Sequence, residues 1–264
     1  MDIGMPTLME HRSLEECAIL CKKLQMNFIE LNMNLLEFQT DRVDVDKLNR
    51  IREKEGIYFT FHLDENLNVC DLNPKVADAY RKTVMETIAI AKRIKAPILN
   101  MHLTNGVYFT LPEKKIYVFS QYYNHYMNKL CKFRDRCEKA IGSSNIKICI
   151  ENAEGFQSFA RDGIELLLES KVFGLTFDIG HNYLAKKKDE SFIMQHSDRL
   201  LHMHVHDAIG KQDHLPLGQG EINLNKKFQL ARDCDCRIVF ESKTEEGLKK
   251  TIARLSQYDG FKSC

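Results

Sequence analysis

The feature that most constrains the fold of this chain is a repeated alternation of short β-branched or aromatic runs with longer stretches of helical periodicity. The short runs have the length and composition of β-strands and are separated by turn residues. Such alternation is typical of βα units arranged around a parallel sheet. We predict eight strands, at residues 1–8, 28–33, 57–63, 97–103, 146–150, 173–177, 200–205 and 237–240.

Helical patterns separate these strands. Ser13 and Glu16 form a capping-box signature before the first helix, and Asn73 and Pro74 begin a long one. No linker or composition shift divides the 264 residues, so eight βα units predict an α/β protein with one domain, residues 1–264, folded as a single (β/α)8 TIM barrel. A doubly wound open sheet is the alternative. The other helical stripes lie at residues 45–56, 164–168, 224–230 and 248–255.

A long aromatic-rich segment follows the fourth strand. Its pattern predicts that residues 111–140 are mostly helical, with a stop at residues 142–145. An outer-ring helix packed on the core is the favoured role, while a lid over the barrel mouth and an oligomer contact stay open. The oligomeric state is therefore left undecided.

The composition limits the partners and the compartment of the protein. Lys plus Arg (38) nearly equals Asp plus Glu (37), which disfavours nucleic acid and anionic membranes as partners. No apolar run approaches the roughly 20 residues that span a bilayer. The nine cysteines are odd in number and include no CxxC pair, and no hydrophobic secretory segment begins the sequence, so we expect reduced thiols and a cytoplasmic location.

Acidic and histidine side chains recur at the carboxyl ends of six predicted strands. In a closed barrel these ends converge on one mouth, so residues distant in sequence become neighbours. Crowded carboxylates and imidazoles need a cation to offset their burial, and a metal ion is predicted. Three carboxylates with one imidazole suit Mn²⁺, Mg²⁺ or Co²⁺, whereas several histidines per ion favour Zn²⁺. The residues are His62, His102, Glu151, Asp178, His181, His204 and Glu241.

The motifs around these residues resemble a known family, the xylose isomerase-like barrels, which include sugar phosphate isomerases and epimerases and the endonuclease IV (AP endonuclease family 2) enzymes. The resemblance runs along most of the chain. It implies that one divalent ion (Mn²⁺, Mg²⁺, Co²⁺ or Zn²⁺) is bound by Glu151, Asp178, His204 and Glu241. The matching pieces are FHLDENLN, ILNMHLTNG, ICIENAEG, LTFDIGHNYL, HVHDAIGKQDHLPLGQGEI and VFES.

Strand seven carries three histidines, His202, His204 and His206, at alternate positions on one face, so periodicity alone cannot choose the ligand. The family motif selects His204. His202 would then lie deeper in the barrel in a hydrogen-bonded core position, and His206 stands where relatives often carry another polar residue. Both stay outside the predicted site.

The resemblance implies an isomerase or epimerase of a small sugar or sugar phosphate that works through a metal-stabilised enediolate. Glu151 and Glu241 would exchange the proton, one removing it and the other returning it. The sequence does not choose between isomerisation and epimerisation. The predicted substrate contacts, which are also candidate ligands of further ions, are His62, His102, His181 and His214.

The first alternative is an endonuclease IV-type zinc phosphoesterase acting on abasic DNA, which would need additional Zn²⁺ ions. His62, His102 and Glu151 match its first ion, and His181 and His214 remain for its third. The position expected to supply a carboxylate to the third ion is occupied by Gln212. Asp213 is one residue out of register. Asp178, His204 and Glu241 match its second ion.

A metal-dependent polyol dehydratase and a barrel that binds sugar without turnover are lesser alternatives.

Three further sequence features bear on the function. Relatives that epimerise ketoses at carbon 3 carry an arginine six positions after the strand-seven ligand, where this chain has Gly210, so a close match to that subgroup is not expected. Gly218 and Gly220 either present backbone N–H groups to an anion or serve only the turn. Lys186 to Lys188 is expected to be a solvated face.

Overall fold

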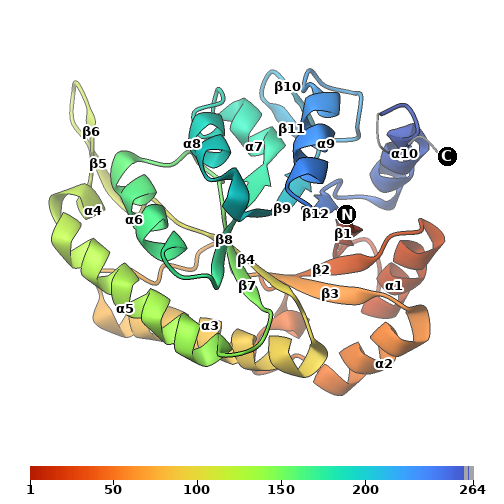
Figure 1. The fold of residues 1–264 in the computed structure, drawn as a ribbon, viewed down its shortest axis with the longest axis horizontal. Helices are drawn as coiled ribbons and strands as arrows, with labels where there is room; N and C mark the ends of the chain where they lie inside the picture. Colours follow the sequence, from red (N-terminus) through yellow and green to blue (C-terminus); the bar gives the residue numbers. More distant parts are fainter. Residues whose placement is uncertain (259–260, 262–264) are drawn as a thin grey trace.

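The computed structural model describes residues 1–258 and 261, and it is a closed barrel of eight strands (Figure 1). Each barrel strand pairs in parallel with the next one along the chain, and β1 closes the ring by pairing with both β2 and β12. The predicted (β/α)8 TIM barrel is therefore confirmed, and the open sheet is excluded. The barrel strands are β1 (Ile3–Pro6), β2 (Phe28–Asn32), β3 (Tyr58–His62), β4 (Ile98–His102), β7 (Lys147–Glu151), β8 (Phe173–Asp178), β9 (Leu200–Val205) and β12 (Arg237–Phe240).

Helices surround the strands in Figure 1, and some of them begin at side-chain caps. Ser13 accepts a hydrogen bond from the Glu16 N–H, and Asn73 accepts one from Lys75. Among residues 1–258, no helix combines the length and apolar character that crossing a membrane requires. The helices are α1 (Leu14–Lys23), η1 (Leu36–Phe38), α2 (Val45–Glu55), α3 (Pro74–Ile94), α4 (Val118–Gln121), α5 (Tyr123–Ile141), α6 (Ser158–Leu168), α7 (Ile179–Leu184), α8 (Glu190–Gln195), η2 (Ser197–Arg199), α9 (Leu224–Asp233) and α10 (Glu245–Leu255).

The strand register brings the polar strand ends to one level. His102 on β4 pairs with Glu151 on β7, and Asp178 on β8 pairs with His204 on β9. Glu241 follows β12 directly, and its N–H bonds to the Val205 carbonyl of β9. Apolar side chains of the strands pack into one buried core with the inner faces of the helices. The core therefore fixes the backbone on which the polar mouth is built.

The prediction that residues 111–140 are mostly helical is wrong for the first part of that segment. Strands β5 (Tyr108–Thr110) and β6 (Lys115–Tyr117) form an antiparallel hairpin that projects from the barrel at the upper left of Figure 1. Pro112 disfavours helical backbone at the residue before it, so the chain turns back on itself there. The run KIY then pairs with YFT as a strand.

The rest of this segment is helical, with a break at Tyr122 between α4 and α5. The favoured role, an outer-ring helix packed on the core, is confirmed for α5, because its side chains at helical spacing are buried. The predicted helix at 164–168 is too short, since α6 begins at Ser158. The buried side chains of α5 are Tyr126, Leu130, Phe133, Cys137 and Ile141.

The loop after β9 carries a second hairpin, β10 (Asp207–Ile209) with β11 (Gln212–Leu215), that the sequence did not predict. It is held by the Asp207 carboxylate, which is 1% exposed. Oδ2 accepts from the N–H groups of Gly218 and Gly220, both at 2.9 Å. Oδ1 accepts from Ala208 at 3.0 Å and from Ile222 at 3.2 Å. The two glycine amides are thus taken by an internal carboxylate, and the suggestion that they hold a substrate anion is wrong.

We predict that Asp207→Asn lowers the free energy of unfolding by about 2 kcal/mol, because the amide replaces a charged acceptor of four backbone hydrogen bonds. Urea unfolding followed by circular dichroism measures the change. The control is Asp233→Asn on the exposed face of α9, which should stay within about 0.5 kcal/mol of the unaltered protein. Equal stability of the two variants would contradict the role of Asp207.

Candidate metal centre

Three of the predicted ligands surround a nitrogen atom of the fourth, His204. His204 Nδ1 lies 3.2 Å from Glu151 Oε1, 3.5 Å from Glu241 Oε2 and 3.8 Å from Asp178 Oδ2. The side chains come from β7, β8, β9 and the residue after β12, and each is 9% exposed or less. The barrel therefore gathers the whole predicted ligand set, from residues up to 90 positions apart (151 to 241), at its mouth.

The four histidines predicted as substrate contacts surround this group. Nε2 of His62 and Nε2 of His102 lie 3.4 and 3.1 Å from Glu151 Oε2. His181 Nδ1 is 3.4 Å from Asp178 Oδ2, and His214 Nε2 is 3.5 Å from Glu241 Oε2. The side chains of His102, His181 and His214 are 16, 21 and 23% exposed, whereas that of His62 is only 8% exposed. Three of the four are thus accessible from the mouth.

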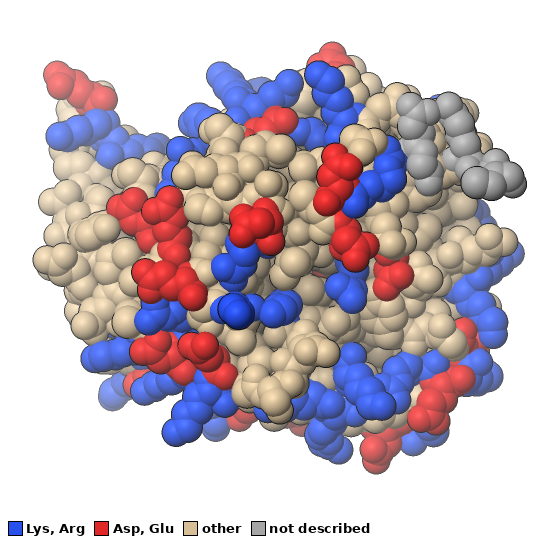
Figure 2. Space-filling model, viewed as in Figure 1, with Lys and Arg blue, Asp and Glu red and all other residues tan. Residues whose placement is uncertain are grey.

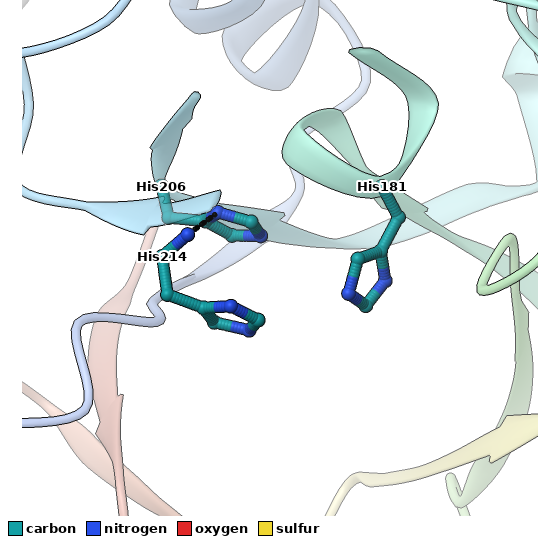
Figure 3. A group of neighbouring side chains, drawn as sticks. All are labelled: His181, His206 and His214. Carbon is teal, nitrogen blue, oxygen red and sulfur yellow. Dashed lines mark hydrogen bonds between the residues drawn. The ribbon is translucent and has the colours of Figure 1, made fainter. Parts of the chain in front are cut away.

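His206, which the sequence analysis left outside the site, lies within it. Its Nε2 is 3.1 Å from Asp178 Oδ1, and its ring stacks on that of His214 with centroids 4.3 Å apart. Figure 3 shows the stacked pair facing His181, and its dashed line marks the hydrogen bond of 2.7 Å from the His214 N–H to His206 Nδ1. A Cβ on Gly180 would lie 2.0 Å from the His206 ring, so this ring position requires glycine there.

The hydrogen bond from the His214 amide fixes the tautomer of neutral His206. A backbone N–H only donates, so Nδ1 of His206 must offer its lone pair. The ring proton then sits on Nε2, from which it is donated to Asp178. In this tautomer His206 holds the carboxylate of Asp178, one of the predicted ligands.

Glu30 is the second residue that the sequence analysis missed. It lies in the middle of β2, is 3% exposed, and contacts His202 Nε2 at 3.0 Å and His204 Nε2 at 2.8 Å. The predicted buried, hydrogen-bonded position of His202 is confirmed. A carboxylate inside the apolar run FIELN was an available signal, because a buried charge requires a partner.

The ionisation of the site follows from its burial and its neighbours. Burial raises the pKa values of Glu151 and Glu241, but His204 and other cations lower both well below the ordinary range. Burial lowers the pKa of His204, yet Glu151 and the other carboxylates raise it well above the usual value. Burial also lowers the pKa values of His62 and His181, but neighbouring carboxylates raise both to about 9. In the protein alone, protons on the histidines therefore balance the carboxylates.

The ligand atoms fit a divalent cation. Glu151 Oε1, Glu241 Oε2 and His204 Nδ1 are buried, face one another and have no hydrogen-bond partner of their own. Buried polar atoms are rarely left in this state unless an ion or water satisfies them. Three carboxylates with one imidazole form an oxygen-rich set that suits Mn²⁺, Mg²⁺ or Co²⁺ and also accepts Zn²⁺.

Comparison with known proteins agrees with this architecture. A family model described as xylose isomerase-like TIM barrel matches residues 19–258. Uncharacterized protein MJ1188 of Methanocaldococcus jannaschii is 26% identical over 205 residues, which cover 75% of this chain and 71% of the relative. The solved structure of a D-tagatose 3-epimerase-like protein has a TM-score of 0.78 at 21% identity and covers 98% of this chain and 97% of its own. IolI protein with a bound zinc atom has a TM-score of 0.75 at 15% identity, covering 98% of this chain and 100% of its own.

We predict that the metal-free protein loses stability as the pH rises from 7 to 9. The pKa of His62 is about 9 in the folded chain, against 6.5 for an unperturbed histidine, so its stabilising charge is fully present below pH 6.5 and disappears as the pH passes 9. The expected decline is on the order of 1 kcal/mol per pH unit in this window. Urea unfolding in the presence of a chelator measures it.

The matched variants are His62→Gln, which should make the decline shallower, and His125→Gln on the exposed face of α5, which should leave it unchanged. Added divalent ion should stabilise the protein more at pH 9 than at pH 7, because fewer protons compete for the ligands. A metal-free stability that stays constant from pH 7 to 9 would contradict this description of the site.

Proposed function

The chain belongs to the xylose isomerase-like TIM barrel family, and from this premise we propose that it is a divalent-metal-dependent isomerase or epimerase of a small sugar or sugar phosphate. The observation that carries the proposal is the convergence of Glu151, Asp178, Glu241 and His204 with unpartnered ligand atoms facing one another. The sugar epimerase-like neighbour and the zinc-containing IolI neighbour give fold-level support.

In this proposal Glu151, Asp178, His204 and Glu241 hold one ion. When bound, a divalent ion polarises the carbonyl of a sugar and stabilises negative charge that develops on its oxygens. Glu151 and Glu241 are assigned the proton transfer. Both have pKa values lowered below the ordinary range, although burial opposes this, so both are ionised in the protein alone.

The two glutamates approach the site from different sides, because β8 and β9 lie between β7 and β12 in the barrel order. One glutamate removes a proton from the hydroxyl-bearing carbon next to the sugar carbonyl, and the other glutamate, after taking up a proton from water, donates that proton. Return to the same carbon on the opposite face gives an epimer, and return to the neighbouring carbon interconverts aldose and ketose. Lys243 Nζ lies 2.5 Å from Glu241 Oε1, which leaves Oε2 directed toward the histidines.

His102, His181 and His214 are assigned to the sugar hydroxyls, because they are the site histidines with exposed surface. His62, also predicted as a substrate contact, is more enclosed and is assigned to hold Glu151 beside the sugar. A phosphate group is not required by this proposal, since Asp207 already occupies the amides of Gly218 and Gly220.

The endonuclease IV-type alternative is supported by the contact of both His62 and His102 with Glu151, as its first zinc ion would require. The ligand atoms of His181, His206 and His214 also lie close enough together to hold a further ion. Its third ion has weaker support. Gln212 is exposed, and Asp213 Oδ1 lies 3.0 Å from His214 Nδ1. Lysines and arginines are interspersed with acidic residues over the face of the molecule in Figure 2.

We predict that Glu151→Gln and Glu241→Gln each reduce turnover by about 10²- to 10⁴-fold while the protein stays folded, because each removes a proton acceptor. Turnover is measured by NMR as deuterium incorporation into ketoses and aldoses in deuterated water, with Mn²⁺, Co²⁺, Mg²⁺ or Zn²⁺ supplied. Glu246→Gln on the exposed face of α10 is the matched control and should retain full activity.

Full activity of Glu241→Gln would refute the assigned proton exchange. Cleavage of abasic-site DNA by the zinc-loaded protein, with no deuterium incorporation into any sugar, would favour the endonuclease alternative instead.

A further inference from the structure

Glu30 reaches the site from the far side of the barrel interior. Its strand, β2, is separated from β9 by β1 and β12 in the barrel order, yet its carboxylate touches two histidines of β9. Oε1 lies 3.0 Å from His202 Nε2 and accepts a hydrogen bond of 3.1 Å from the Thr60 hydroxyl. Oε2 lies 2.8 Å from His204 Nε2. Oε1 is therefore hydrogen-bonded, and Oε2 is in ion-pair contact with His204.

Both nitrogens of His204 lie beside carboxylates, on opposite sides of the ring. Nδ1 lies near Glu151, Asp178 and Glu241, while Nε2 lies 2.8 Å from Glu30. A neutral imidazole carries one N–H, and the nitrogen that binds a metal must be the one without it. Three carboxylates around Nδ1 would attract the proton to that nitrogen, which is the wrong tautomer for a ligand. A fourth carboxylate at Nε2 offers the proton an equivalent acceptor away from the ion.

We propose that Glu30 is a positioning residue that keeps the proton of His204 on Nε2 and its Nδ1 free, and thereby sets the affinity of the site for its cation. This inference rests on the proposed metal site. Glu30 touches neither the expected ion nor the sugar, and acts only through His204. A carboxylate that orients a ligand histidine through its second nitrogen is a recurring device in metal sites, and its loss costs about 10- to 100-fold in affinity.

The neighbours of Glu30 support a positioning role. A buried carboxylate is costly, and replacing a whole buried ion pair by apolar side chains of similar volume is often neutral or stabilising for the fold. Thr60 and His202 fix Oε1, so that Oε2 is left for His204 alone. Neither solubility nor packing of β2 would by itself require these contacts of Glu30.

The test compares Glu30→Gln with the unaltered protein in direct titrations with Mn²⁺ followed by electron paramagnetic resonance. The variant should bind Mn²⁺ about 10- to 100-fold more weakly. In the zinc-loaded protein, the Nε2 proton of His204 should resonate far downfield by NMR and move upfield in Glu30→Gln. A purely structural role would leave this proton signal of the folded, loaded protein unchanged.

The matched control is Asp189→Asn, another fully buried carboxylate, which accepts from the Phe156 N–H outside the metal centre and should leave Mn²⁺ affinity unchanged. If Glu30→Gln does not fold, Thr60→Val removes one donor to Glu30 and should weaken Mn²⁺ binding several-fold. Wild-type affinity in the folded variants would overturn the role of Glu30 and leave the proposed function intact. Failure of the unaltered protein to bind Mn²⁺ or Zn²⁺ would overturn both.

Discussion

The burial of four carboxylates against one imidazole is the interaction on which the rest of this structure depends. Glu30, Glu151, Asp178 and Glu241 are each 7% exposed or less, and His204 lies among all four. Carboxylates in such surroundings need opposite charge and hydrogen bonds, which histidines supply in the protein alone and a divalent cation supplies in the proposed enzyme. The closed barrel brings residues from five different strands to this point, so the chemistry of the site depends directly on the fold.

Much of this arrangement could be predicted from the sequence because it obeys local rules. The eight barrel strands follow from β-branched runs, and residues at their carboxyl ends converge whatever the loops do. Glu30 escaped this reasoning because it lies inside a strand and its partner His202 is 172 residues away. Glu30 and His202 meet only when the strand barrel is closed. The hairpin at β5 and β6 and the use of the Gly218 and Gly220 amides by Asp207 likewise depend on tertiary contacts that periodicity does not encode.

The choice between one ion and several depends on how the surrounding histidines are held. His206 takes a hydrogen bond from the His214 amide on Nδ1 and directs Nε2 at Asp178, so it supports a carboxylate that the proposed site would use. His204 differs from it, because its Nε2 lies beside Glu30 and its Nδ1 lies beside Glu151, Asp178 and Glu241. Two histidines two residues apart on one strand thus have distinct roles, set by what their second nitrogen contacts. This division favours a single, oxygen-rich cation site with partly exposed histidines at its rim.

The number of ions bound per chain tests this central claim most directly. The protein is saturated separately with Mn²⁺ and with Zn²⁺, dialysed to remove loosely held ions, and analysed for metal content by mass spectrometry. We expect about one ion per chain in each case, bound through Glu151, Asp178, His204 and Glu241. Three tightly held Zn²⁺ ions per chain would contradict a single-ion site and would indicate the cluster of a phosphoesterase.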